Sequence, residues 1–210
     1  MTDPISTIIV KIVPAIWSWL IAIFKRPEIP IRLAPENVFE HLKPNTSIAK
    51  ARELLGVPTR ETEEYLSYKF KDAFIQVNTK DGKSISALCV VLPRIKKRAT
   101  FKVYPLSFIL GKSSMNEASW SEAPTYEYDS SSKHHQFLTK QYFGYDGHYL
   151  NYIFGVISAP HIYAPDVEWH CEEEGEMGQV VSQPSEIIPN MVCVISGDPE
   201  NFIFDFWAFH

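Results

Sequence analysis

The amino-acid sequence predicts an α+β protein in which an N-terminal transmembrane helix precedes a mainly antiparallel sheet domain with short helices. Three observations predict this class. Residues 5–24 are apolar at almost every position, two Asp-Gly pairs each follow residues typical of strands, and the helical signals elsewhere are short. We expect residues 1–30 to form a membrane anchor and a proline-rich spacer, and residues 31–210 to form a single α+β domain.

The apolar run is long enough to cross a bilayer as one helix. It has twenty positions and a single charge, Lys11. At about 1.5 Å per residue it covers roughly 30 Å, the thickness of the hydrocarbon core. No basic residue precedes it and no A-x-A pattern follows it, so a cleaved signal peptide is not expected. The anchor residues are Ile5, Lys11, Trp17, Trp19, Lys25 and Arg26.

Two other roles for this helix stay open. Polar positions form one stripe along it (Thr7, Lys11, Pro14, Ser18 and Lys25). Such a stripe suits a helix that lies flat in the interface or packs on a partner helix in a membrane complex. A helix buried in a water-soluble core is the third reading.

The basic residues that flank the run predict its orientation. Lys25, Arg26 and Arg32 follow it, and none precedes it. The positive-inside rule therefore predicts a single-pass membrane protein with its C-terminal domain in the cytoplasm. The three cysteines are odd in number and widely spaced, as in proteins of a reducing compartment.

Charge limits the partners. A net charge of −5 argues against nucleic-acid binding, and we predict the lipid bilayer and a protein as partners. One local cluster is basic: Arg94, Lys96, Lys97, Arg98 and Lys102. It is either a solvated loop between strands or a contact with anionic lipid headgroups.

The first half of the domain reads as helix, strand, turn, strand. A short helix is expected over residues 36–42. The residues 45–47 are N-cap candidates for a second helix, which Gly56 ends. We expect one strand over 65–77, a turn at Asp81-Gly82 and another strand over 84–92.

A similar order follows. Ser114 and Glu117 form a capping box, aromatic residues up to Phe143 indicate strand material, and Asp146-Gly147 predicts a turn before a strand over 149–157. Residues 45–93 and 106–160 are therefore candidates for a duplicated α-β-β unit. The last part, 190–210, is expected to be a hairpin whose aromatic second strand lies inside the sheet, with Asp205 at a wet or hydrogen-bonded position.

The stretches SIAKARELLGVP (47–58) and YKFKDAFIQVNTKDGKSISAL (68–88) resemble the small domain of BamE-like (SmpA-like) bacterial envelope proteins. The chain lacks the lipobox cysteine of those lipoproteins, which act as scaffolds without catalysis. Together with FGYDGHYLNYIFG (143–155), these stretches also resemble uncharacterised bacterial proteins with one inner-membrane span before such a domain. The resemblance implies protein binding and assigns no catalytic residues.

Catalytic signals are weak. His134, His135 and His148 with a carboxylate such as Asp146 or Glu127 are the candidates for a membrane-tethered hydrolase. The sequence has no H-x-x-x-H, C-x-x-C or H-E-x-x-H motif, so no metal or cofactor is predicted. An aromatic series from Tyr142 to Phe154 either lines a groove or fills the core. We expect a membrane-anchored, non-catalytic interaction or sensing module at the cytoplasmic face, with the hydrolase and an accessory subunit of a membrane complex as alternatives.

Overall fold

The computed structural model describes residues 32–95, 101–118, 127–131, 133–145, 148–165, 167, 169–170, 179–180 and 185–209. All of them belong to one unit, Arg32–His210. The predicted anchor residues, the basic residues Lys96, Lys97 and Arg98, and Asp146 lie outside the described residues. Within the described part, no helix is long and apolar enough to cross a membrane.

The unit is α+β, as predicted. The helices are α2 (Val38–His41), α3 (Ile48–Leu55) and α4 (Met115–Ala118), with 3-10 helices η1 (Pro199–Asn201) and η2 (Phe206–Phe209). The main sheet contains β1 (Arg60–Glu61), β2 (Tyr65–Lys69), β3 (Phe74–Thr79), β4 (Ile85–Val91), β7 (Glu127–Ser130), β8 (His135–Tyr145), β9 (His148–Ser158) and β12 (Met191–Ile195). Two small ribbons pair β5 (Phe101–Lys102) with β6 (Ile109–Leu110) and β10 (Trp169–His170) with β11 (Gln179–Val180).

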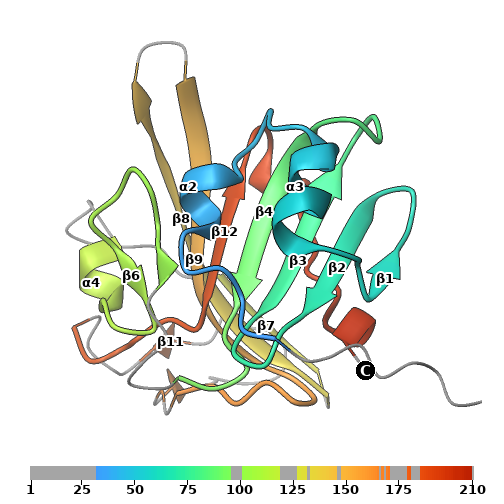
Figure 1. Cartoon of the computed structure of the whole chain (residues 1–210). Helices are drawn as coiled ribbons and strands as arrows, with labels where there is room; N and C mark the ends of the chain where they lie inside the picture. The colour runs from blue at the N-terminus through green and yellow to red at the C-terminus, as the bar shows by residue number, and fades with distance from the viewer. Residues whose placement is uncertain are drawn as a thin grey trace, which may run out of the picture. The chain divides into compact units, whose positions relative to one another are not determined.

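The main sheet has the order β1-β2-β3-β4-β12-β9-β8-β7, and every neighbouring pair is antiparallel (Figure 1). The strand that comes last in the chain, β12, lies in the middle. It pairs with β4 on one side and with β9 on the other. Two hairpins that are distant in sequence, β3–β4 and β8–β9, are thereby joined into one sheet.

Each face of the sheet packs against a different part of the chain. Alternate residues of β3, β4, β12 and β9 join a core formed with α2, α3, α4 and the β5–β6 ribbon, which we call the helix face. The intervening residues join a second core with Phe204, Ala208 and Phe209, on the strap face. Because both faces are covered, β12 is buried at all five positions.

Local sequence explains where the helices begin and end. The Ser47 hydroxyl accepts a hydrogen bond from the Lys50 N–H at the start of α3, and Gly56 ends α3 with φ of 80°. The Glu117 carboxylate accepts a hydrogen bond from the Ser114 N–H at 2.9 Å, as the capping box predicted. These predicted boundaries are confirmed.

The prediction of one strand over residues 65–77 is wrong, since a turn divides it into β2 and β3. The Phe70 N–H donates to the Ala73 carbonyl, and the Asp72 carboxylate accepts from the Ala34 N–H at 2.9 Å. Most positions of both strands are buried. Lys69, Lys71 and Asp72 are the polar signal of the break, but aromatic residues continue across it, and the strand prediction followed the aromatic residues.

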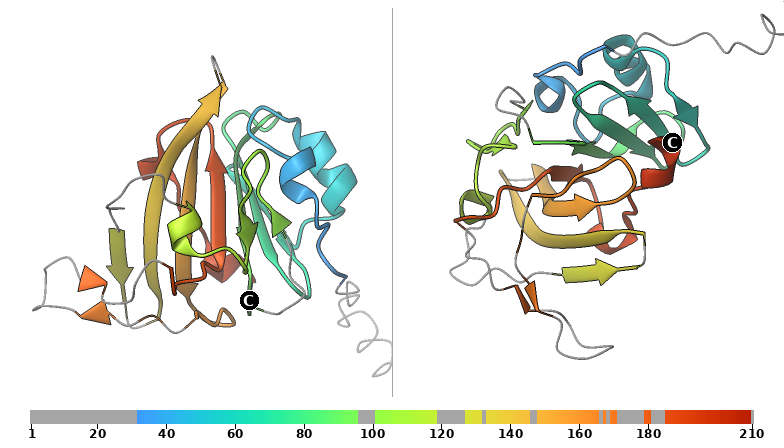
Figure 2. Two further views of the ribbon diagram at one scale, coloured as in Figure 1. Left: turned by 90° about the vertical axis from the view of Figure 1, so that its left-hand side faces the viewer. Right: turned by 90° about the horizontal axis from the view of Figure 1, so that it is seen from below.

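The predicted C-terminal hairpin over residues 190–210 is also wrong. β12 is a strand, but residues 199–209 form η1, an extended segment and η2. A hairpin partner needs a free edge of β12, and β4 and β9 occupy both edges. The segment 198–209, which we call the strap, instead crosses the strap face of the sheet. The sheet is curved, so the strap lies between its two edges (Figure 2, right).

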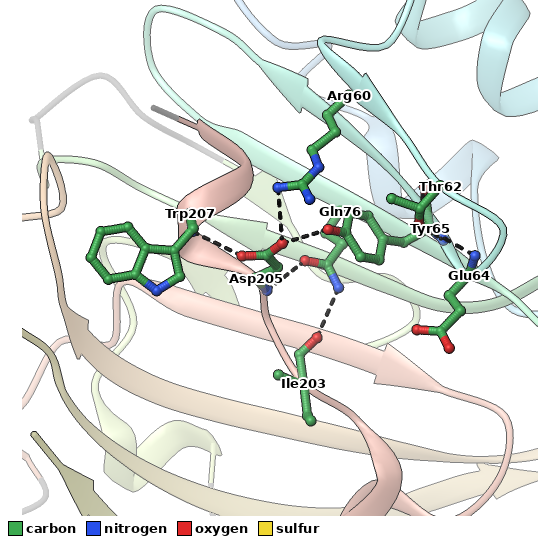
Figure 3. Close-up of polar contacts among 8 residues, drawn as sticks. All are labelled: Arg60, Thr62, Glu64, Tyr65, Gln76, Ile203, Asp205 and Trp207. Carbon is green, nitrogen blue, oxygen red and sulfur yellow. Dashed lines mark hydrogen bonds and ion pairs between the residues drawn. The ribbon is translucent and has the colours of Figure 1, made fainter.

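Polar side chains of the first hairpins hold the strap in place (Figure 3). The Gln76 side chain accepts from the Asp205 N–H at 2.8 Å and donates to the Ile203 carbonyl at 2.9 Å. The Asp205 carboxylate accepts from the Tyr65 hydroxyl and pairs with Arg60. The hydrogen-bonded position predicted for Asp205 is confirmed, and its partners come from β1, β2, β3 and the strap itself, where the Trp207 N–H donates to its carboxylate at 3.0 Å.

The two halves are not arranged as consecutive copies in the sheet. Moving outward from β12, the first half gives β4 and then β3, and the second gives β9 and then β8. The helix of the first half has eight residues and that of the second has four. The duplicated unit stays a prediction.

The buried end of the strap should contribute most of its stabilising energy. Phe209 is 1% exposed and stacks on Phe74 with ring centroids 4.7 Å apart. Phe209→Ala is expected to lower the free energy of unfolding by about 3–5 kcal/mol, measured by urea denaturation. Ile203→Ala is the matched control in the same segment, because Ile203 is 77% exposed and should change stability little. Equal effects of the two substitutions would contradict this account of the strap.

The Tyr65–Asp205 hydrogen bond should make stability depend on alkaline pH. Burial and this hydrogen bond raise the pKa of Tyr65 above its usual value of about 10. The contribution of this hydrogen bond to the free energy of unfolding is therefore complete below about pH 10 and is lost as the pH rises through the raised pKa of Tyr65. Tyr65→Phe should cost about 1.5 kcal/mol at pH 7 and flatten the alkaline part of the stability curve. The control Tyr142→Phe, at an exposed tyrosine, should alter neither.

Candidate functional site

The strongest candidate for a binding surface is the end of the sheet where β8 passes into β9. Ile195, the last residue of β12, pairs with Asn151, so β8 and β9 continue past β12 as a free hairpin (Figure 1). Near its tip Tyr142 is 65% exposed and Tyr149 is 47% exposed. Their rings stack with centroids 5.1 Å apart. Exposed, stacked aromatic rings of this kind are typical of interfaces.

A hollow of about 400 Å³ opens beside this hairpin on the helix face. Its size falls in the range of ligand-binding clefts. The floor is apolar, because Leu42, Tyr152 and Val194 belong to the core. The hollow is lined by Phe39, Leu42, Lys43, Pro44, Asn45, Tyr104, Pro105, Gly144, Tyr149, Leu150, Tyr152, Val194 and Ser196.

Three separate segments bring the rim of the hollow together. α2 buries Phe39 and leads into an exposed loop with Lys43 and Asn45. Asn45 has φ of 71°, a left-handed conformation that asparagine tolerates better than most residues. Tyr104, from the loop between β5 and β6, is 53% exposed. Because Phe143 and Leu150 pack on the helix-face core, strand alternation directs the stacked rings of Tyr142 and Tyr149 to the other side of the hairpin from the hollow. We call this end of the molecule, with Tyr104 and the hollow on one side of the hairpin and the stacked tyrosines on the other, the hairpin-end surface.

The chemistry of the hollow suits an apolar group that carries a negative charge. Among the described residues the Lys43 ammonium has no ion-pair partner, and it is exposed at the rim. A free ammonium beside an apolar floor can bind a carboxylate whose apolar part enters the hollow.

The aromatic series divides between the two roles that the sequence left open. Tyr152 and Phe154 are buried in the core, and Phe143 packs against it. Tyr142 and Tyr149 are exposed at the hairpin end. Sequence reasoning missed Tyr104 and Lys43 altogether, because nothing in their local sequence indicates that three segments meet there.

The histidines predicted as catalytic candidates do not form one site. His135 pairs with Ser158 and His148 pairs with Tyr145, so the two lie at opposite ends of the β8–β9 hairpin. Ten residues of β9 separate those positions, about 33 Å along an extended strand. The combination of His148 with His134 or His135 therefore cannot act on one substrate at a single centre.

His134 and Glu127 line a second cavity, of about 350 Å³, between the β7–β8 edge and the strap. The His134 Nδ1 lies 2.7 Å from the Ser131 hydroxyl, and its ring packs on Phe206. The Glu127 carboxylate instead pairs with the Lys140 ammonium at 2.7 Å. In the sheet, Glu127 of β7 lies opposite Leu138 of β8. Four strand positions, about 13 Å, separate Leu138 from His134.

Lys140 bridges two carboxylates in this cavity. Its ammonium lies 2.7 Å from Glu127 and 2.5 Å from Glu200, an ion triad that ties β7, β8 and η1 together. Burial lowers the pKa of Lys140, but the hydrogen bonds to both carboxylates outweigh this effect and raise it. The amine stays charged, so we interpret the triad as a structural clamp on the strap.

Two cysteines also meet in the structure. Cys89 of β4 and Cys193 of β12 are cross-strand partners, both buried and both free thiols. Burial and the hydrogen bond between the Cys193 and Cys89 thiols raise the pKa of Cys193 well above its usual value. A thiol in this environment is a poor nucleophile.

The basic cluster is described only in part. Arg94 is exposed after β4, and its guanidinium lies over the Tyr163 ring at 4.3 Å. Lys102 is exposed in β5. The described residues contain no group of three or more His, Cys, Asp or Glu side chains that could hold a metal ion.

No family model, no curated protein and no solved structure matches this chain. The likeness to BamE-like proteins therefore stays a resemblance in sequence, and the site has to be interpreted from its own geometry.

Proposed function

We propose that this protein is a single-pass membrane protein whose C-terminal α+β domain is a non-catalytic module that binds a protein partner in the cytoplasm. The observation that carries the proposal is the hairpin-end surface. It combines three exposed tyrosines, an apolar hollow and an exposed ammonium without an ion-pair partner among the described residues.

Tyrosine is enriched in protein interfaces because it buries a large apolar area and keeps a polar hydroxyl at low entropic cost. The hollow supplies the concave part into which a partner side chain can pack, and Lys43 supplies charge complementarity. A partner segment with an apolar side chain next to an acidic residue fits this surface best.

The position of the surface supports the same proposal. The described chain begins at Arg32, next to the turn between β2 and β3, because the Arg32 carbonyl accepts from the Lys71 N–H of that turn at 3.0 Å. That turn lies at the opposite end of the strands from the tip of the β8–β9 hairpin. With residues 1–30 in a bilayer, the hairpin-end surface would be held away from the point where the chain leaves the anchor.

Partner binding can be tested by photo-crosslinking in cells. Benzoylphenylalanine in place of Tyr104 and, separately, of Tyr149 should give an adduct of the same mass, because both residues line one hollow. Val57, which is 78% exposed elsewhere on the domain, is the control position and should give no such adduct. Lys43→Glu should reduce both adducts at least tenfold without changing the melting temperature. Adducts of equal intensity from Val57, or none from either tyrosine, would refute the proposed surface.

The anchor is tested by deletion. Removing residues 1–30 should release the remaining residues from the membrane fraction as a folded domain, checked by fractionation and near-UV circular dichroism. The full chain should need detergent for extraction. A truncated protein that aggregates without a near-UV signal, beside a full chain soluble without detergent, would instead make residues 5–24 part of a soluble core.

A further inference from the structure

The end of the sheet opposite the hairpin tip, which we call the entry end, gathers parts that are distant in sequence. It comprises Arg32, the turn 70–73, the segment 93–95, the loop 159–163, the residues just before β8, and η2. Cross-strand register places them together, because β2, β4 and β9 finish here and β3 and β8 begin here. η2 joins them because the Lys69 ammonium donates to the Phe209 carbonyl at 2.7 Å. Figure 1 shows η2 at the same end as the turn between β2 and β3.

Two exposed cation–aromatic pairs lie at this end. The Arg94 guanidinium covers the Tyr163 ring at 4.3 Å, and Tyr163 is 56% exposed. The Lys133 ammonium lies 5.2 Å from the Trp207 ring, and Trp207 is 43% exposed. The Tyr163 N–H donates to the Pro93 carbonyl, which fixes the first pair to the end of β4. Leu33 and Lys71 are also exposed at the entry end, next to Arg32.

From this arrangement we infer that the entry end is a second, peripheral membrane contact that binds anionic lipid headgroups. Tryptophan and tyrosine favour the interfacial zone, where the ring is in an apolar environment and its N–H or O–H is wet. Lysine and arginine beside them bind lipid phosphates and the negative surface of the cytoplasmic leaflet. The entry end offers both kinds of side chain, from separate segments, on one exposed surface.

Two observations favour a lipid surface over a protein partner here. The chain enters the described unit at Arg32, on this same end, so the predicted anchor would hold the surface within reach of headgroups. The basic cluster also begins here, at Arg94. Asp72 and Asp129 are acidic residues of the same end, so the contact depends on the aromatic rings as well as on the cations. The inference rests on the proposed anchor and adds a role for Tyr163, Trp207 and Lys133.

The test uses the full chain, reconstituted in vesicles of phosphatidylcholine alone or with 30% phosphatidylglycerol whose acyl chains are brominated near the glycerol. Bromine quenches tryptophan fluorescence at short range. The fluorescence quenching due to Trp207 is the difference in quenching between the wild-type chain and the Trp207→Phe variant. We expect at least a twofold larger quench of Trp207 in anionic than in neutral vesicles carrying the same bromine, and loss of the difference at high salt.

The double variant Arg94→Glu/Lys133→Glu should abolish the anionic-specific quench. Its matched control is Lys80→Glu/Lys83→Glu, the same charge change at the exposed turn between β3 and β4, at the opposite end of the sheet; it should keep the quench. Both variants should retain the wild-type melting temperature.

The outcomes separate this inference from the proposed anchor. A chain that floats with both kinds of vesicle but shows equal, salt-insensitive quenching of Trp207 overturns the peripheral contact and leaves the anchor intact. Equal loss of the quench in the two double variants assigns it to net charge and also overturns the contact. A chain that floats with neither overturns the anchor and the inference together.

Discussion

The central interaction of this structure is the pairing of β12 with β4 on one side and β9 on the other. Five residues near the end of the chain supply the only ladder that joins the two hairpins in the described sheet. Every side chain of this strand is buried, alternately in the helix-face core and in the strap-face core. Contacts on both faces therefore depend on a strand that can join only after the rest of the sheet has been synthesised.

The same insertion explains the strap. Because β12 has a neighbour on each edge, the residues after it cannot pair with it and must leave the sheet. They leave through Pro199, which has no N–H to donate to a ladder, and turn across the strap face. Their backbone groups bond to Gln76 and Lys69, and the ion triad at Lys140 fixes the beginning of the segment. The strap covers apolar residues of the strap face with Phe204, Ala208 and Phe209, and it leaves Ile203 and Trp207 exposed to solvent.

This architecture gives the two ends of the sheet different characters. At the hairpin end, β8 and β9 extend past β12, so tyrosines near the tip face solvent beside a hollow. At the entry end, loops from several strands converge and present cations stacked on aromatic rings. Because the two ends differ in this way, we propose that they bind different partners, a protein at the hairpin end and lipid headgroups at the entry end. The titratable residues that could have supported catalysis are instead held apart by the rigid hairpin or used in the triad that holds the strap.

By itself the sequence determined the features that depend on neighbours along the chain. These are the α+β class, the caps of α3 and α4, and the hairpin at Asp81-Gly82, each encoded within a few residues by a cap or a turn. It also indicated correctly that Asp205 is hydrogen-bonded within an aromatic tail. Local sequence misled where aromatic residues suggested a continuous strand. The turn in 65–77 was missed although Lys71 and Asp72 mark it, and the aromatic strap was predicted as a strand because aromatic composition does not show that both edges of β12 are occupied.

Only the tertiary structure decided which residues share a surface. Tyr104, Lys43 and Tyr149 meet at the hollow from three segments, and Lys133 meets Trp207 across more than seventy positions. Strand order and sheet curvature decide which of these residues come into contact, and the strand order follows from the pairing of β12 with β4 and β9. No local pattern carries that information, because the edge that β12 occupies is defined only when both hairpins are already formed.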